Sequence, residues 1–207
     1  MTGPLMLCWR GPDPQRFDSA SVALGPSSLR AHGSSLTPSY TLDYRLETGP
    51  DWVTSELNVR ARGDGWWTSL VLRRSARGEW SAAWGGKGVG SLPTELPDLE
   101  SAQDCDLGLC PLTNTMPILR YGLVGASHRG DEDAHDLLMA WVSVPDLAVT
   151  RSEQRYAVSD PVDEGGALVG YSSPGFRTTI EVDADGLVVN YPGLGRRIER
   201  AGLIPSE

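Results

Sequence analysis

The chain has 207 residues, of which 40% are hydrophobic, and carries a formal net charge of −9. This length fits one all-β sandwich or barrel, and such an acidic surface repels nucleic acid and anionic membranes. No stretch approaches the ~18 apolar residues of a membrane span, and the N-terminus lacks the basic and apolar regions of a signal peptide. We therefore expect a soluble, single-domain protein of the cytoplasm that spans residues 1–207.

The first half of the chain predicts a β-meander. Apolar and polar residues alternate strictly over residues 40–47 and again over 57–62, which is the pattern of half-buried strands. A polar Gly-Asp-Gly turn then leads into a strand over residues 66–73. The next strand, over residues 80–84, places two tryptophans and an alanine on one side. Together these segments predict successive antiparallel hairpins.

The middle of the chain is less regular. Residues 85–98 are rich in glycine and proline and show no periodicity, so we expect a loop. Residues 118–125 and 137–144 are predicted as strands that flank a polar loop over residues 127–135. Because the second of these strands is apolar on both faces, it is expected to be a central strand covered on both sides.

The C-terminal third continues the alternation. Residues 176–183 and 187–191 predict two strands, joined by the turn 183–186, in which Gly186 supplies the positive φ that such a turn requires. No segment shows a sustained period of 3.6 residues, so little helix is expected. The fold class predicted from these patterns is all-β.

Asp104 and Asp106 form the most suggestive pair of carboxylates. On an extended strand they share one face, with Cα atoms roughly 6.6–7 Å apart. This spacing suits the acid and the base of an inverting glycoside hydrolase. The alternative is a polar strand end whose carboxylates accept hydrogen bonds from the protein itself, and both interpretations stay open here.

Other motifs point to turns and loops. Residues 183–186 resemble the start of a calcium loop, but the apolar residues 187–189 follow at once, which predicts a hairpin turn. Ser127, His128 and Asp131 lie too close together on one loop to form a rigid catalytic triad. The glycine-rich residues 85–90 lack the spacing of a phosphate-binding loop.

The three cysteines are Cys8, Cys105 and Cys110. An odd number does not suit a disulfide framework, and no second cysteine pair or nearby histidine completes a zinc site. We expect free, buried thiols in a reducing compartment.

A specific motif covers residues 104–120, DCDLGLCPLTNTMPILR. It resembles the D-x-D-L…P-x-T-N-T-x-P-I-x-R block of the bacterial putative glycolipid-binding family. Residues 154–156 (QRY) and 182–194 (VDADGLVVNYPGL) resemble two further elements of that family in the right order, and the resemblance covers roughly residues 8–198. Gly195 stands where an aromatic residue is usual, and one position of an arginine pair is Leu119, so ligand preference is expected to differ at these points.

The resemblance implies one long, curled and mostly antiparallel sheet, a spiral β-roll, with an internal apolar cavity. It implies no cofactor and no catalytic residues. A roll rich in tryptophan and leucine can enclose acyl chains, while polar groups at its rim bind a sugar. The candidate ligand-binding residues are Asp104, Asp106, Thr113, Asn114, Arg120, Gln154, Tyr156 and Tyr191. Each has a structural alternative: Asn114 satisfying buried backbone groups, for example, or Asp106 pairing with Arg120.

Three functions follow as hypotheses. The first is a non-catalytic carrier or sensor that holds a lipid or glycolipid in the cavity of the roll. The second is a hydrolase that uses Asp104 and Asp106. The third is a protein-interaction domain with a solid roll. Saturable lipid binding separates the first hypothesis from the third, and activity that is lost when both aspartates become asparagine identifies the second.

Overall fold

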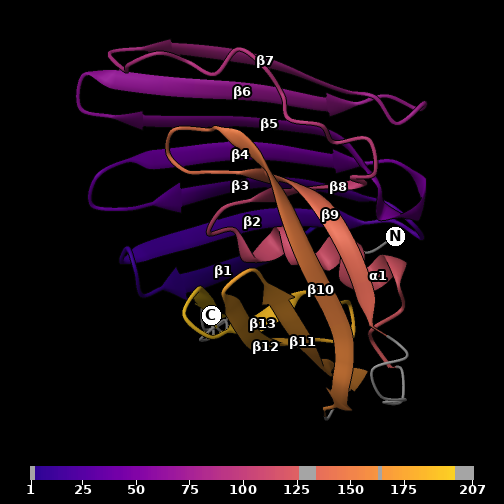
Figure 1. Ribbon diagram of the computed structural model, residues 1–207. Coiled ribbons are helices and arrows are strands. Elements are labelled where there is room, and N and C mark those ends of the chain that lie inside the picture. The colour runs from indigo at the N-terminus through magenta and orange to yellow at the C-terminus, as the bar shows by residue number, and fades with distance from the viewer. Residues whose placement is uncertain (1–2, 126–133, 163–164, 199–207) are drawn as a thin grey trace.

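The computed structural model describes residues 3–125, 134–162 and 165–198 (Figure 1). Within them, one 14-stranded sheet runs in the order β7-β6-β5-β4-β3-β2-β1-β14-β13-β12-β11-β10-β9-β8. Each neighbouring pair is antiparallel except β8 and β9, which are parallel. The prediction of a curled, mostly antiparallel all-β fold is confirmed.

Two meanders make up most of this sheet. The first consists of β1 (Leu5–Gly11), β2 (Arg16–Leu24), β3 (Leu29–Leu36), β4 (Thr41–Thr48), β5 (Thr54–Gly63), β6 (Trp66–Arg74) and β7 (Trp80–Lys87). The second consists of β9 (His135–Val142), β10 (Val149–Pro161), β11 (Ala167–Ser173), β12 (Phe176–Val182), β13 (Val188–Tyr191) and β14 (Gly195–Arg197). They meet where β1 pairs with β14, and β8 (Asp104–Leu107) forms the far edge. The described residues also include the short helices η1 (Pro50–Trp52), η2 (Pro111–Asn114) and α1 (Thr115–Arg120).

The alternating segments fold as predicted. β4 buries Leu42, Tyr44 and Leu46, and β5 buries Leu57 and Val59, because every second side chain of a strand points to the same face. Strands β6, β7, β12 and β13 also match their predicted positions within a few residues. Strands β1, β2, β3, β10, β11 and β14 were not predicted from the sequence.

The sheet rolls up so that its two edges overlap. Trp80 of β7 donates its indole N–H to the carbonyl oxygen of Ala102 (3.1 Å), and Trp84 donates to that of Leu147 (2.9 Å). These bonds hold β7 against the segment before β8 and the turn after β9. The overlap makes the fold a spiral instead of a closed barrel.

Strand β9 lies inside this overlap. Ala140 and Val142 pack into the larger core cluster together with Leu57 of β5, whereas Met139 packs into the smaller cluster with Ile118. The prediction that β9 is covered on both sides is therefore confirmed. It is not a central strand, because it lies second from the end of the sheet.

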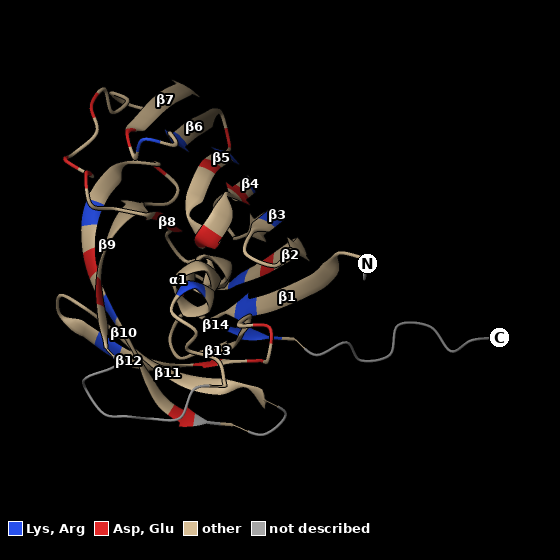
Figure 2. Ribbon diagram, turned by 90° about the vertical axis from the view of Figure 1, so that its right-hand side faces the viewer, with Lys and Arg blue, Asp and Glu red and all other residues tan. Residues whose placement is uncertain are grey.

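Helix α1 lies in the middle of the roll, as Figure 2 shows. The predicted strand over residues 118–125 is therefore wrong: residues Thr115–Arg120 are helical, and Thr115 to Ile118 are buried. Pro117 is tolerated because it lies in the first turn, where backbone N–H groups have no helical partner. The helix and the smaller core cluster occupy the space that a hollow roll would leave open.

The thiols differ in exposure. Cys105 and Cys110 are free and buried, as predicted. Cys8 is free but exposed, because it points to the outer face of β1, so the prediction of burial is wrong for this residue.

Candidate functional site

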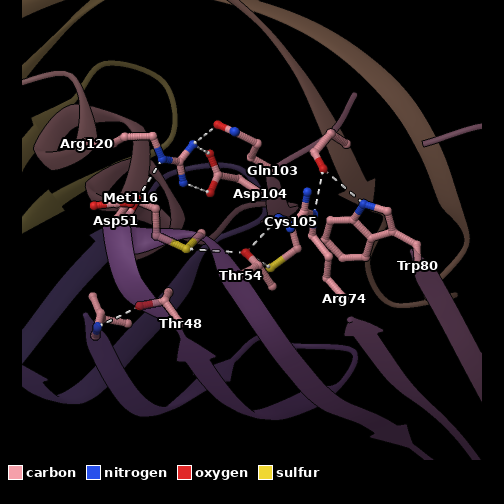
Figure 3. A network of polar contacts seen from close by, with 12 residues as sticks. Thr48, Asp51, Thr54, Arg74, Trp80, Gln103, Asp104, Cys105, Met116 and Arg120 are labelled. Atoms are coloured by element: carbon pink, nitrogen blue, oxygen red, sulfur yellow. Dashed lines mark hydrogen bonds and ion pairs between the residues drawn. The ribbon is translucent and has the colours of Figure 1, made fainter. Parts of the chain in front are cut away.

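Asp104 and Arg120 form a buried ion pair between β8 and α1 (Figure 3). One guanidinium N–H lies 2.7 Å from Asp104 Oδ2, and a second reaches Oδ1. Arg120 also donates to the carbonyl oxygen of Asp51 (2.8 Å) and to Oε1 of Gln103 (3.1 Å). Arg120 thus pairs with Asp104 and not with Asp106, which corrects the structural alternative raised for that pair.

Asp106 binds neutral donors instead. The hydroxyl of Thr113 donates to Oδ1 (2.8 Å), and the amide of Gln154 donates to Oδ2 (2.7 Å). Since Asp104 binds α1 and Asp106 binds the adjoining helix η2, both carboxylates point to the same side of β8. The shared face predicted for the pair is confirmed.

Tyr156 extends these contacts into a buried polar network, formed by Asp106, Thr113, Asn114, Gln154 and Tyr156. Its hydroxyl oxygen lies 3.0 Å from both Asn114 Oδ1 and Gln154 Oε1. The amide of Asn114 donates to the carbonyl oxygen of Pro111 (3.1 Å), which confirms the alternative in which Asn114 satisfies a buried backbone group. The network ties the helical segment to β8 and β10.

Tyr191 lies beside this network instead of in it. Its ring packs on Tyr171 with 5.7 Å between centroids, and Tyr171 meets Tyr156 edge to face at 5.2 Å. The structure therefore brings all eight candidate residues to the interior of the second meander. Contact of these residues with a ligand stays a prediction, and Gln154 and Tyr191 each also line an open cleft.

Burial dominates the electrostatics of the two carboxyls. It raises the pKa of Asp106, and the hydrogen bonds from Gln154 and Thr113 only partly offset that rise. Burial also raises the pKa of Asp104, against the opposing effect of the Arg120 guanidinium. Because their oxygens already accept hydrogen bonds from the protein, the arrangement acts as an anchor for α1.

The raised pKa of Asp106 predicts how stability depends on pH. A carboxyl whose pKa is higher in the folded state contributes stability below its unfolded pKa of about 3.9, and this contribution is lost as pH rises through the folded pKa. We therefore expect the free energy of unfolding of the native protein, minus that of Asp106→Asn, to be largest near the acid end of the pH range. It should shrink as the pH increases.

Urea unfolding of both proteins at several pH values measures this difference. Asp64→Asn, in an exposed turn, controls for the loss of one negative charge. A difference for Asp106→Asn that grows with pH would contradict the raised pKa of Asp106.

Among the described residues, the remaining sequence motifs do not contribute to this network. Asp183 accepts the backbone N–H groups of Asp185 and Leu187 and pairs with Arg197, which confirms a hairpin turn. Ser127, His128 and Asp131 lie outside the described residues, and His135 stacks on Tyr121 with 4.0 Å between centroids. In residues 3–125, 134–162 and 165–198, no group of three or more acidic, histidine or cysteine side chains is placed to hold a metal ion.

An apolar groove opens at the end of the roll where β6 begins and β9 ends. It has a volume of about 350 Å³ and is defined by Trp66, Thr68, Val89, Leu92, Pro93 and Pro145. The hydroxyl of Thr68 donates to the carbonyl oxygen of Pro145 (2.8 Å), which fixes one wall against the other. Ser91 and Asp146 add polar groups to the lining.

This groove was missed by the sequence analysis. The signals were present, since Trp66 follows directly on a turn and residues 88–93 belong to the glycine- and proline-rich stretch. A more enclosed cavity, lined by Tyr40, Tyr44 and Cys110, measures about 20 Å³, which suits roughly one water molecule. The groove therefore offers far more room for an apolar ligand than this cavity does.

No helix in the described part of the chain has the length and apolar character that a membrane crossing needs. No curated protein matches the chain. The chain is similar to a solved structure of a DUF1089 family protein from Pseudomonas aeruginosa, with 26% identity and a TM-score of 0.64. That alignment covers 87% of this chain and 92% of the other. The family model described as "Putative glycolipid-binding" matches residues 6–197, and with this match over nearly its whole length the chain belongs to that family.

Proposed function

We propose that the protein is a non-catalytic binder of an amphiphile, a lipid or glycolipid, whose apolar part lies in the apolar groove. The observation that carries the proposal is the groove itself, at about 350 Å³ and with an apolar lining. Ligand pockets typically measure about 300–1,000 Å³ and combine apolar walls with a few polar groups. The family to which the chain belongs supports a glycolipid as the ligand class.

The groove offers separate contacts for the apolar chain and the sugar of such a molecule. Trp66, Leu92 and Pro93 offer a surface for an acyl or alkyl chain, and burying that surface drives binding. Asp146 and Ser91 lie at the same groove, where they can hydrogen-bond to sugar hydroxyl groups. The proposed site therefore lies at an end of the roll and not in the interior, which α1 fills. We also propose that the protein is located in the cytoplasm, as the free cysteines predict.

The test uses Trp66 as a reporter at the groove. Delipidated protein is titrated with monomeric dodecyl maltoside, and tryptophan fluorescence and native mass spectra are recorded. We expect a saturable signal and a one-to-one adduct. Trp66→Leu should weaken binding about tenfold or more, because the indole forms part of the groove wall.

Trp67→Leu is the matched control. Trp67 lies next in sequence but points to the other face of β6, where it stacks on the guanidinium of Arg60 at 4.4 Å. The Trp67→Leu variant should therefore bind the detergent as tightly as the native protein does. Equal weakening by both substitutions, or no saturable signal in the native protein, would refute the groove as the site.

The filled interior favours a second candidate function. Because α1 and its neighbours occupy the middle of the roll, a solid-cored protein-interaction domain also fits the structure. Fresh protein that carries no extra mass, together with no saturable detergent binding, would favour this alternative.

A further inference from the structure

Two arginines face each other across the strands that join the meanders. Arg10 of β1 and Arg196 of β14 are direct partners in the antiparallel register, and both are exposed. Like charges directly opposite each other destabilise a sheet. Among the residues that the structure describes, neither side chain forms an ion pair; Arg10 only approaches the ring of Phe17, at 5.9 Å. An unneutralised pair of this kind is unexpected in a chain with a net charge of −9.

The pair borders an open cleft of about 550 Å³ between the turn after β1 and the turn between β13 and β14. Asn190 and Gln15 add side-chain amides to its lining, and Gly193 adds backbone without a side chain. The guanidinium groups are donors only, and each side-chain amide offers a donor and an acceptor, so the cleft presents positive charge together with hydrogen-bond donors. Figure 2 shows basic segments side by side on β1 and β14.

Two of the nearby carboxylates are engaged elsewhere, whereas Asp13, in the turn after β1 that borders the cleft, forms no ion pair within the described residues. Asp183 pairs with Arg197 at 2.5 Å, and Asp18 pairs with Arg16 at 2.9 Å. Glu181 faces Asn190 in the sheet, so one strand separates it from Arg196. Within the described residues no ion pair neutralises Arg10 or Arg196.

A third guanidinium lies on the inner face of the sheet, opposite the exposed arginine pair. Arg16 is buried, and its Nη1 has no hydrogen-bond acceptor. It packs against Gly11, which lines the cleft: a Cβ atom at Gly11 would lie 2.4 Å from this nitrogen. A buried donor without a partner is costly, and a negative charge in the cleft, across β1, would attract this guanidinium through the sheet.

We propose that this cleft is a phosphate-binding site, which takes inorganic phosphate or the phosphate monoester of a small molecule. Arginine forks suit phosphate because each guanidinium can donate two parallel hydrogen bonds to its oxygens. A dianion between Arg10 and Arg196 would turn their repulsion into two attractive pairs. The site is separate from the apolar groove and stands without the proposed lipid binding.

The test is calorimetric titration of the full chain with inorganic phosphate and with glycerol 3-phosphate at low ionic strength. We expect saturable binding and a higher melting temperature in phosphate, because a ligand that binds the folded state stabilises it. Arg10→Gln and Arg196→Gln should each weaken binding about tenfold or more. Tighter binding of the ester identifies an organic ligand, and equal binding identifies the free ion.

Arg45→Gln is the control, because it removes the same charge from an exposed position on β4 of the same sheet. It should leave phosphate binding unchanged. Without phosphate, Arg196→Gln should melt no lower than the native protein, since it relieves repulsion. No saturable binding, or equal weakening by Arg45→Gln, would overturn the proposal.

Discussion

Replacing Arg120 by methionine is expected to lower the free energy of unfolding by about 3–5 kcal/mol. The substitution leaves Asp104 buried without its counter-charge, with its side chain only 2% exposed. It also removes the hydrogen bonds to Asp51 and Gln103, which hold the end of α1 in place. Urea unfolding at neutral pH measures the loss as a lower transition midpoint.

Two further variants show whether the pair causes the effect. Arg120→Met combined with Asp104→Leu should regain most of the lost stability, because removing both charges leaves no uncompensated one. Arg62→Met breaks an exposed pair with Asp43 and should cost less than about 1 kcal/mol. If the double variant is no more stable than Arg120→Met, the unpaired carboxylate is not the cause.

Truncating Ile118 to alanine is expected to lower the free energy of unfolding by about 2–5 kcal/mol. Ile118 of α1 is fully buried and packs into the smaller core cluster with Met139 and Tyr156. The loss combines the transfer of the side chain to water with the cavity that it leaves. Urea unfolding again gives the magnitude.

A graded series at the same position tests the packing. Ile118→Val removes one methylene and should cost about 0.5–1.5 kcal/mol. The expected losses of unfolding free energy for Ile118→Ala and Ile118→Val both follow from a closely packed interior around α1. A cost below about 1 kcal/mol for Ile118→Ala would show that the roll is loosely filled there, and would return the interior to consideration as a ligand cavity.

Strands with one buried face were predictable from the sequence. In β4 and β5, apolar and polar residues alternate over residues 41–47 and 57–62, so the period of two is unmistakable. In β3 the same signal is blurred, since Gly33, Ser34 and Ser35 follow one another with intermediate burial. Small polar residues fit either face of a strand, which hides the period.

Helix α1 could not be recognised by its pattern. It has six residues, and four consecutive ones are buried because the roll surrounds it. A short apolar run buried on all sides shows neither helical nor strand periodicity. The strand predicted at Ile118 followed from β-branched and apolar residues whose surroundings lie far away in the sequence.

The candidate site was predictable in composition but not in pairing. The motif over residues 104–120 identified the polar residues that meet in the interior. Which aspartate Arg120 meets depends on the position of α1 over β8, and spacing along the chain does not specify it. The apolar groove combines Trp66 with Pro145, which are distant in sequence, so no local pattern marks it.

The pairing of β1 with β14 has a consequence for the order of folding. Neighbouring strands within each meander are neighbours in sequence, whereas Trp9 pairs with Arg197 near the opposite end of the chain. Contacts between distant residues form slowly, because a long loop must close first. The two meanders can therefore assemble separately, and the contact that unites them is made last. Until then β1 is an open edge that can pair with other chains, so a chain in which this contact has not yet formed is prone to aggregate.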